Sequence, residues 1–202
     1  MAVRNHALDQ IIIDAARAEF LEKGYRDASL HKIAARAGLT TGALYTRYKN
    51  KDALFCSLVQ EVMDVVHAHS KEIQELYMKA QASGDLAEIL AAIRSEEDIY
   101  QELLLEHKDA CVLFFCRSEG SSLETMLDTM LEQKGTQTVE YLRRIAKTGL
   151  DLDGVGMLLA SQFLFFRKIL ERGYSPEKAL SCMKTVELYM DAGWKAIFEA
   201  IL

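Results

Sequence analysis

Proline is almost absent from this 202-residue sequence, in which Pro176 is the single example. Because proline interrupts helices, its scarcity permits long continuous ones. Segments in which β-branched residues alternate with polar residues, which would indicate strands, are also missing. Half of the residues are hydrophobic, which is enough to bury a large core and argues against disorder. These features predict an all-α protein.

Cysteine is scarce and irregularly placed. Cys56, Cys111, Cys116 and Cys182 form no C-x-x-C motif and no framework that would indicate disulfides. Each lies in an apolar helical context, where a reduced thiol behaves as a small hydrophobic group. Residues 1–10 are polar instead of signal-like, and no hydrophobic run approaches the length of a membrane span. These absences predict a cytoplasmic protein with no membrane partner.

Motifs for enzymatic chemistry are missing as well. The sequence has no glycine-rich phosphate loop and no G-x-S-x-G. His67 and His69 stand two apart on a predicted helix and point away from each other, and Asp64 with His67 has no evident third ligand. Asp151 and Asp153 lack the other ligands of a calcium loop and indicate a helix cap. We therefore expect no enzymatic activity, no cofactor and no metal site.

Charge is unevenly distributed along the chain. The net charge is −6, which by itself argues against nucleic-acid binding. Residues 1–55, however, contain nine Lys and Arg against six Asp and Glu, while the remainder contains 15 against 24. A basic N-terminal part on an acidic body is typical of a DNA-binding module attached to a domain that stays away from the duplex.

Residues 29–55 have the pattern of two short helices joined by a tight turn and followed by the start of a third helix. Glycine suits the turn because it enters the left-handed conformation without a Cβ penalty. Ser29 caps the start of the first helix, and Gly38 ends it. Thr40 or Thr41 caps the second helix, over residues 42–48. Asn50 caps the third helix, which starts at Lys51. This connection predicts a helix-turn-helix, whose second helix enters the major groove of DNA.

The second short helix and its flanks have side chains suited to nucleic-acid contact. Hydroxyl groups can reach phosphate oxygens or base edges, positive charges attract the backbone, and Gly42 leaves room for close approach. Arg47 is the side chain here that could read guanine through two parallel hydrogen bonds. The expected contacts are Thr40, Thr41, Gly42, Tyr45, Thr46, Arg47, Lys49 and Lys51. A simple amphipathic hairpin packed on a core is the alternative.

The stretch A-x-x-A-G-L-T-x-G-A-L-Y-x-R-Y-K-N-K-D-A-L, from Ala34 to Leu54, resembles the DNA-binding domain of the tetracycline-repressor (TetR) family. The preceding A-A-R-A-E-F-L-E-K-G-Y-R-D-A-S-L, from Ala15 to Leu30, is similar to the first helix of that family and its link to the second. The resemblance implies a three-helix DNA-binding domain in residues 1–55. It also implies a larger helical domain in residues 56–202, which binds a small-molecule effector and forms a homodimer.

The resemblance implies roles for individual residues too. The positions at which the family contacts the DNA backbone correspond to Ser29, Thr40, Thr41, Tyr45, Lys49 and Lys51. Thr41 departs from the family, which often has lysine there, and Arg47 stands where histidine or another polar residue is common. These departures bear on which operator is recognised. We expect Lys51 to be exposed.

Caps and helix breakers divide the rest of the chain. We expect helices over residues 6–23, 51–82, 86–96, 98–116, 121–147, 152–172 and 176–201. Gly24 should end the first of these helices, with Tyr25 packing back over the bundle. Ser121 and Glu124 have the spacing of a capping box, and Pro176 occupies a favourable first helical position.

The last two predicted helices have broad apolar faces. In the TetR family the corresponding pair forms a four-helix bundle with a second subunit, so we expect dimerisation through Leu159, Phe163, Phe166, Val186, Tyr189, Trp194 and Ile197. An ordinary core within one chain is the alternative. A dimer is favoured because one short recognition helix reads few base pairs, and symmetric half-sites require two copies.

A pocket for the effector is expected among methionine and phenylalanine side chains of the larger domain, since these form adaptable apolar cavities. The candidate contacts are Met63, His67, Phe114, Met126, Met130, Gln162, Phe163 and Phe166. The same spacing of apolar side chains is typical of plain core packing, which is the alternative for each of them.

Two functions therefore remain open. The preferred one is a dimeric, ligand-responsive transcriptional regulator, a repressor by resemblance, which binds a palindromic operator in double-stranded DNA and is released by a small, largely apolar effector. The rival is a helical dimeric sensor or interaction protein without sequence-specific DNA binding. The cations Arg47, Lys49 and Lys51 beside Tyr45 favour the first, because the rival would be expected to carry acidic or bulky apolar residues there.

Overall fold

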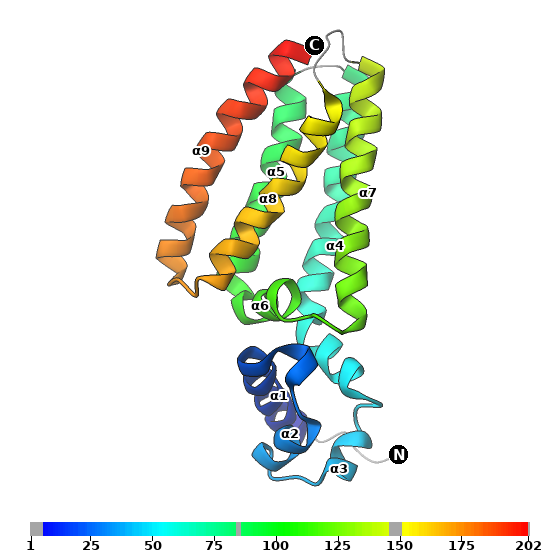
Figure 1. The fold of residues 1–202 in the computed structure, drawn as a ribbon, viewed down its shortest axis with the longest axis vertical. Helices are drawn as coiled ribbons and strands as arrows, with labels where there is room; N and C mark the ends of the chain where they lie inside the picture. The colour runs from blue at the N-terminus through cyan, green and yellow to red at the C-terminus, as the bar shows by residue number, and fades with distance from the viewer. Residues whose placement is uncertain (1–5, 84–85, 146–150, 202) are drawn as a thin grey trace. The chain divides into compact units, whose positions relative to one another are not determined.

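The computed structural model describes residues 6–83, 86–145 and 151–201, and all the regular structure in these ranges is helical (Figure 1). The all-α prediction is confirmed. The helices are α1 (His6–Asp27), α2 (Leu30–Arg36), α3 (Thr41–Tyr45), α4 (Lys51–Ser83), α5 (Leu86–Glu106), α6 (Lys108–Cys116), α7 (Ser122–Ile145), α8 (Leu152–Glu171) and α9 (Pro176–Ile201).

The chain forms two compact units. Unit 1 contains the described residues up to Val62 together with Asp109–Leu127, and unit 2 contains Met63–Lys108 together with the described residues from Asp128 onward. Helices α4 and α7 each begin in unit 1 and continue into unit 2. The functional division into residues 1–55 and 56–202 stays a prediction. The N-terminal unit of the structure also includes most of α6 and the start of α7, which are distant from it in sequence.

The core of unit 1 is built around an aromatic cluster. The Phe20 ring lies edge-on to Phe55 with centroids 5.0 Å apart, and Tyr25 meets Phe55 at 5.2 Å. Gly24 interrupts α1 as predicted, because its φ of 74° lies in the left-handed region that favours glycine. This break turns Tyr25 back onto the core, and one further turn extends α1 to Asp27.

Helix α2 contacts both α1 and α3 and fixes their arrangement within unit 1. Its apolar face is buried through Ile33 and Ala34, and α3 contributes Leu44. Burying side chains of this size stabilises a small helical unit by about 1.5–3 kcal/mol for each large one. These contacts support two helices that are too short to be stable alone.

The predicted boundary between helices 86–96 and 98–116 is wrong. Helix α5 runs without a break to Glu106, and the interruption comes at His107. Polar residues such as those at 95–98 can cap a helix that begins after them. Without glycine or proline, however, they do not prevent a helix from continuing through them. Helix α6 then begins at Lys108, and its buried side chains include Leu113, Phe114 and Phe115.

Unit 2 has a core in which α9 packs against both α5 and α8 (Figure 1). Its large buried side chains are Leu103, Leu104, Phe163, Phe166, Met183, Met190 and Trp194. Side chains cap two of these helices, and of the predicted pair Asp151 and Asp153 the structure selects Asp151. The Asp151 side chain accepts from the Asp153 amide at the start of α8, and the Ser175 hydroxyl accepts from the Lys178 amide at the start of α9.

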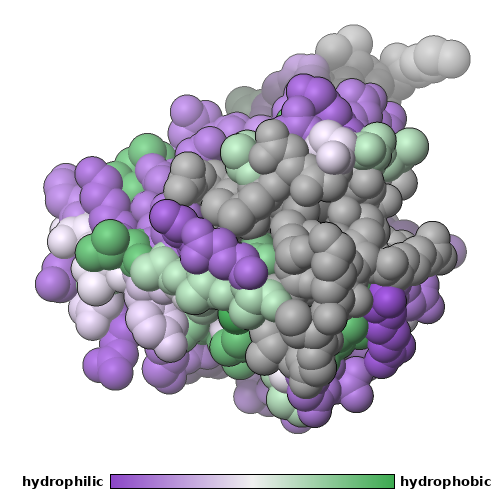
Figure 2. All heavy atoms as spheres, turned by 90° about the horizontal axis from the view of Figure 1, so that it is seen from above, coloured by the Kyte–Doolittle hydropathy of each residue, from purple (hydrophilic) through white to green (hydrophobic). Residues whose placement is uncertain are grey.

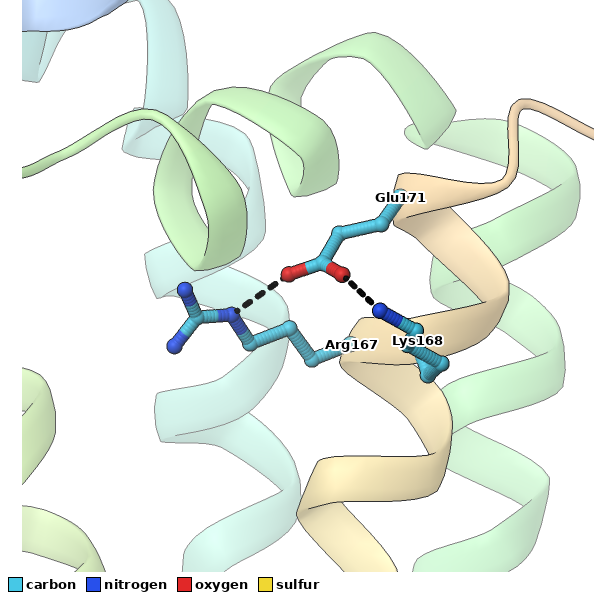
Figure 3. Close-up of polar contacts among 3 residues, drawn as sticks. All are labelled: Arg167, Lys168 and Glu171. Carbon is cyan, nitrogen blue, oxygen red and sulfur yellow. Dashed lines mark hydrogen bonds and ion pairs between the residues drawn. The ribbon is translucent and has the colours of Figure 1, made fainter.

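The last turns of α8 carry an exposed group of ion pairs. Glu171 accepts from Nε of Arg167 at 3.1 Å and from Nζ of Lys168 at 3.0 Å (Figure 3). The hydrogen bond from Lys168 is the main reason that the pKa of Glu171 lies below its usual range.

On the face shown in Figure 2, hydrophilic residues surround smaller groups of hydrophobic ones.

In the ranges that the structure describes, no helix is both long and apolar enough to cross a membrane. Within the same ranges, no three His, Cys, Asp or Glu side chains gather in a way that could hold a metal ion. The four cysteines are free thiols, and burial raises the pKa of Cys111 to about 12. That thiol is therefore a packing group and not a reactive one.

Candidate nucleic-acid interface

The turn between α2 and α3 has the geometry of a helix-turn-helix. Gly38 has a φ of 68°, and the backbone amide of Leu39 donates to the carbonyl of Ala34 at 2.9 Å. This closes the end of α2 in the way that a left-handed glycine permits. Ser29 caps α2 by accepting from the Lys32 amide, and Thr40 caps α3 by accepting from the Ala43 amide at 3.2 Å. Of the two predicted caps for α3, the structure selects Thr40.

Helix α3 is shorter than the predicted span of residues 42–48, since it ends at Tyr45. The Thr46 hydroxyl donates to the Ala43 carbonyl at 2.7 Å, and the Arg47 amide donates to the Leu44 carbonyl three residues back. A threonine side chain that bonds a nearby carbonyl competes with regular helix formation, and the three-residue bond tightens the last turn. Arg47 and Lys49 therefore lie on the segment that leads from α3 to α4.

The outer surface of α3 exposes the side chains that were predicted to contact DNA. Leu44 is buried, whereas the next residue, Tyr45, is 51% exposed. Exposed residues around Tyr45 are Thr40, Gly42, Thr46, Arg47 and Lys49, while Thr41 is half-buried. A Cβ placed at Gly42 would meet nothing closer than the Thr40 hydroxyl at 3.9 Å. This surface offers hydroxyl and cationic donors with open space around them.

Arg47 has a partner that the sequence did not reveal. Its Nε donates to Oδ1 of Asp9 at 2.8 Å, across 38 residues of sequence. Asp9 lies in the first turn of α1. The contact holds one edge of the guanidinium group against α1.

Lys51 is half-buried, and the expectation that it is exposed is wrong. Its ammonium group donates to the Arg26 carbonyl at 3.0 Å and lies 4.7 Å above the centre of the Tyr25 ring. Partial burial lowers its pKa. The first residue of α4 therefore ties that helix to the end of α1, and its contact with DNA stays a prediction.

The start of α4 is also tied to the start of α7, through Asp52. Oδ1 of Asp52 accepts from the Ser122 amide at 2.9 Å, and Oδ2 accepts from the Ser122 hydroxyl at 2.7 Å. Burial alone would raise the pKa of Asp52, but these hydrogen bonds outweigh it and lower the pKa. In turn, burial and the neighbouring Asp52 carboxylate raise the pKa of Tyr25.

The predicted capping box at this helix start takes a different form. Glu124 accepts from the amide of Gly120 at 2.7 Å, and the Ser121 hydroxyl donates to the Ser118 carbonyl while accepting from the Leu123 amide. The two side chains thus organise the whole turn before α7. Asp52 had no sequence signal for its role, because its partner is 70 residues away.

A small cavity of about 40 Å³ lies among α5, α8 and α9 in unit 2. Its lining residues are Tyr100, Gln162, Phe165, Phe166, Ile169, Met183, Val186, Glu187 and Met190. Within the described part of the chain, Nε2 of Gln162 is buried without a hydrogen-bond partner. A buried amide in that state costs free energy, so the site favours an occupant with an acceptor atom.

Two of the predicted effector contacts, Gln162 and Phe166, line this cavity. Phe163 is buried in the core of the same unit, Met63 is half-buried, and His67 is exposed. Phe114 is buried and Met126 half-buried in unit 1, while the side chain of Met130 lies outside the described residues. Gln162 and Phe166 are thus the members of the predicted set that line this cavity, and the roles of the others stay predictions.

The predicted dimerisation residues also divide into groups. Leu159, Phe163, Phe166 and Trp194 are buried within the chain itself, Val186 and Ile197 are half-buried, and Tyr189 is exposed. The four buried residues are therefore core residues in this structure and are unavailable at its surface. Large apolar side chains that are exposed on the same two helices are Met157, Leu158, Leu164, Phe165 and Leu188.

Comparison with known proteins identifies the family of the helix-turn-helix domain. Residues 12–58, which contain the helix-turn-helix, match the model of the bacterial regulatory proteins of the tetR family. The helix-turn-helix part of this chain is a tetR-family DNA-binding domain. The resemblance of residues 15–54 to that family is confirmed.

Curated relatives of this chain match over part of their length. A fatty acid metabolism regulator protein of Bacillus subtilis is 36% identical over 81 residues, which cover 40% of each chain. The transcriptional regulator AcrR of Shigella flexneri is 34% identical over 84 residues, or 42% of this chain and 37% of the relative. The chain therefore matches about two fifths of the length of these relatives. They are regulators and not enzymes, which agrees with the expectation of a non-enzymatic protein.

Solved structures share the fold over nearly the whole chain. The ketosteroid transcriptional regulator KstR2 of Mycobacterium tuberculosis has a TM-score of 0.62 at 18% identity, with 96% of this chain and 95% of that one covered. NalD, a secondary repressor of a multidrug efflux pump in Pseudomonas aeruginosa, has a TM-score of 0.53 at 21% identity, with 89% and 95% covered. At these identities the likeness establishes the fold alone, an N-terminal helix-turn-helix domain followed by a helical domain.

Proposed function

We propose that the chain is a ligand-responsive transcriptional repressor that binds a palindromic operator as a homodimer and is released by a small, largely apolar effector. The observation that supports this most directly is the exposed surface of α3, where Tyr45 is flanked by hydroxyl groups and by the cations Arg47 and Lys49. Phosphate oxygens and base edges accept from such groups. The rival, a helical sensor that makes no sequence-specific DNA contact, has no need for this set of donors around an exposed tyrosine.

Selection of bound duplexes from a random DNA pool tests the proposal. We expect the purified protein to enrich a two-fold-symmetric sequence and Tyr45→Ala to lose the enrichment. Lys49→Ala should bind every duplex more weakly, whatever its sequence. It should also lower the salt slope by about one unit, as the loss of one phosphate contact does. Lys178→Ala, at an exposed lysine of α9, is the matched control and should bind like wild type.

The outcome that contradicts the proposal is a lack of enrichment at low salt in which wild type and Tyr45→Ala behave alike. That result would favour the rival hypothesis, a helical sensor that makes no sequence-specific DNA contact. Enrichment of an asymmetric site would support DNA binding while contradicting the dimeric operator.

The dimer is supported by the exposed apolar residues of α8 and α9. Single apolar side chains are common on surfaces, but several large ones on two neighbouring helices indicate an interaction surface. A C2 dimer is the commonest assembly and presents two recognition helices to two half-sites.

The effector site is supported by the cavity beside Gln162. Its volume of about 40 Å³ has room for a few water molecules, so a larger ligand requires the flexible methionine side chains of its lining to move. The name of the Bacillus subtilis relative, a regulator of fatty acid metabolism, agrees with an apolar ligand. Once an operator duplex is selected, its release by fatty acids and by other apolar compounds with one acceptor group provides the screen.

A further inference from the structure

The ion pair between Arg47 and Asp9 differs from the other ion pairs of unit 1. The Arg47 side chain is 28% exposed and that of Asp9 is 16% exposed. By comparison, Arg26 with Glu119 is 63% and 66% exposed, and both pairs lie within unit 1. A pair that is partly shielded from solvent is screened less by salt and holds its geometry better than a fully exposed surface pair.

The hydrogen bond engages one edge of the guanidinium group. Asp9 accepts from Nε of Arg47, and arginine has five N–H donors, four of which belong to the two terminal nitrogens. Those two nitrogens form the planar fork that matches two acceptors side by side, such as O6 and N7 of guanine or two oxygens of one phosphate. A contact at Nε leaves this fork available and fixes the plane in which it lies.

The position of Asp9 makes it a suitable anchor. It lies on α1, a helix packed into unit 1, whereas Arg47 follows the end of α3 on a connecting segment. Without the anchor, a long arginine side chain on such a segment would lose more conformational freedom on binding DNA. The carboxylate has a cost as well, because a negative charge near the duplex repels phosphates and weakens binding to any sequence.

We propose that Asp9 is a positioning residue that orients the guanidinium of Arg47 so that its two terminal nitrogens face paired acceptors of the operator. The proposal rests on the DNA-binding function proposed above. Asp9 thereby strengthens binding to the correct duplex relative to other duplexes, while its charge lowers affinity for all of them. The group recognised is a pair of acceptors in one plane, on a guanine edge or on a phosphate.

The test measures affinity for the selected operator and for a scrambled duplex of equal length. Asp9→Ala should bind the operator roughly tenfold more weakly, in line with the loss of one oriented two-donor contact, and should bind the scrambled duplex at least as well as wild type. Asp9→Asn keeps an oxygen acceptor for Nε and should retain the operator preference within about twofold. Asp14→Asn removes a carboxylate from an exposed site on the same helix, so it should strengthen binding to both duplexes equally.

A double-mutant comparison isolates the partnership. If Asp9 acts through Arg47, the variant with both Asp9→Ala and Arg47→Ala should bind the operator no more weakly than Arg47→Ala alone. Operators with single base changes separate the two acceptor sources. If Arg47 contacts a guanine, changing that base pair should remove the difference in affinity between wild type and Arg47→Ala. If Arg47 contacts a phosphate, the difference should be the same for every sequence, and Arg47→Ala should have a smaller salt slope.

Two results would overturn the inference. One is that Asp9→Ala leaves the ratio of operator to scrambled affinity unchanged, as expected for Asp14→Asn, which would mean that Asp9 acts only through its negative charge. Alternatively, the effects of Asp9→Ala and Arg47→Ala could simply add. Both results presuppose a wild-type protein that prefers its operator, whereas a wild type without preference would overturn the proposed function together with this inference.

Discussion

Asp52 shows how one side chain can serve two helices. It lies in the first turn of α4, and its carboxylate accepts from the amide and the hydroxyl of Ser122 at the start of α7. The free amides at a helix start need acceptors, and a negative charge is favourable there. The cap for α7 is therefore supplied from another helix of the same unit.

Replacing Asp52 should destabilise the protein in a pH-dependent way. The pKa of Asp52 is lowered in the folded state, so its contribution to stability is present above the ordinary carboxyl pKa and is lost as pH falls through the lowered value. We expect Asp52→Asn to cost about 1–2 kcal/mol at pH 7 and to cost less at an acidic pH below the lowered pKa, where the wild-type carboxyl is protonated too.

Urea unfolding at both pH values measures this difference, with Asp98→Asn at an exposed position of α5 as the control for charge alone. An equal cost for Asp52→Asn at the two pH values would contradict the role of the ionised carboxylate. The same experiment reports on unit 1, because Asp52 and Ser122 both belong to it.

At the scale of elements, close helix packing in unit 2 depends on Gly156. A Cβ at this position of α8 would lie 2.9 Å from Cγ2 of Val139 on α7. Such an approach requires movement, and valine has few alternatives because its branched side chain is stiff. Gly154, two residues earlier on the same helix, has open space where a Cβ would be.

These two glycines give a matched pair of substitutions. Alanine is the better helix former by about 1 kcal/mol, so Gly154→Ala should stabilise the protein by a few tenths to about 1 kcal/mol. Gly156→Ala should instead destabilise it by about 1 kcal/mol or more, because overpacking outweighs the gain in helix propensity. Urea unfolding of both variants provides the measurement, and stabilisation by both would show that α7 and α8 adjust freely.

Local chemistry explains which element boundaries were predicted correctly. Helices α2, α8 and α9 begin after Ser29, Asp151 and Ser175, whose side chains accept from amides three or fewer residues ahead. Gly24 interrupts α1 and Gly38 follows the end of α2, both in the left-handed conformation. The break at His107 and the early end of α3 at Tyr45 have no such signal in the sequence, and at the end of α3 the Thr46 hydroxyl bond competes with the helix.

At the scale of the whole molecule, the exposed apolar residues lead to a prediction about assembly. Leu164 on α8 is 60% exposed and Leu188 on α9 is 75% exposed. If the two helices form the dimer interface, Leu164→Glu and Leu188→Glu should each weaken the dimer at least about tenfold, because a buried unpaired charge is costly. Leu105→Glu, on α5, is the control, since Leu105 is 55% exposed.

Sedimentation equilibrium measures the dimer constant of each variant. A monomeric wild type, or equal weakening by Leu105→Glu, would place the interface elsewhere or remove it. Loss of the dimer should also abolish selection of a symmetric operator, because one recognition helix cannot span two half-sites.

The sequence by itself determined those features that depend on neighbours within a few residues. The scarcity of proline and the placement of caps and glycines predicted the helices and the helix-turn-helix, and the hydroxyl and cationic side chains after Gly38 predicted a contact surface that includes the exposed Tyr45. Tertiary structure alone decided which distant groups meet. The pairs Asp9 with Arg47 and Asp52 with Ser122, and the burial of Lys51, join residues 25 to 70 positions apart. No periodicity encodes such contacts, because they depend on how whole helices pack and on which polar groups that packing deprives of water.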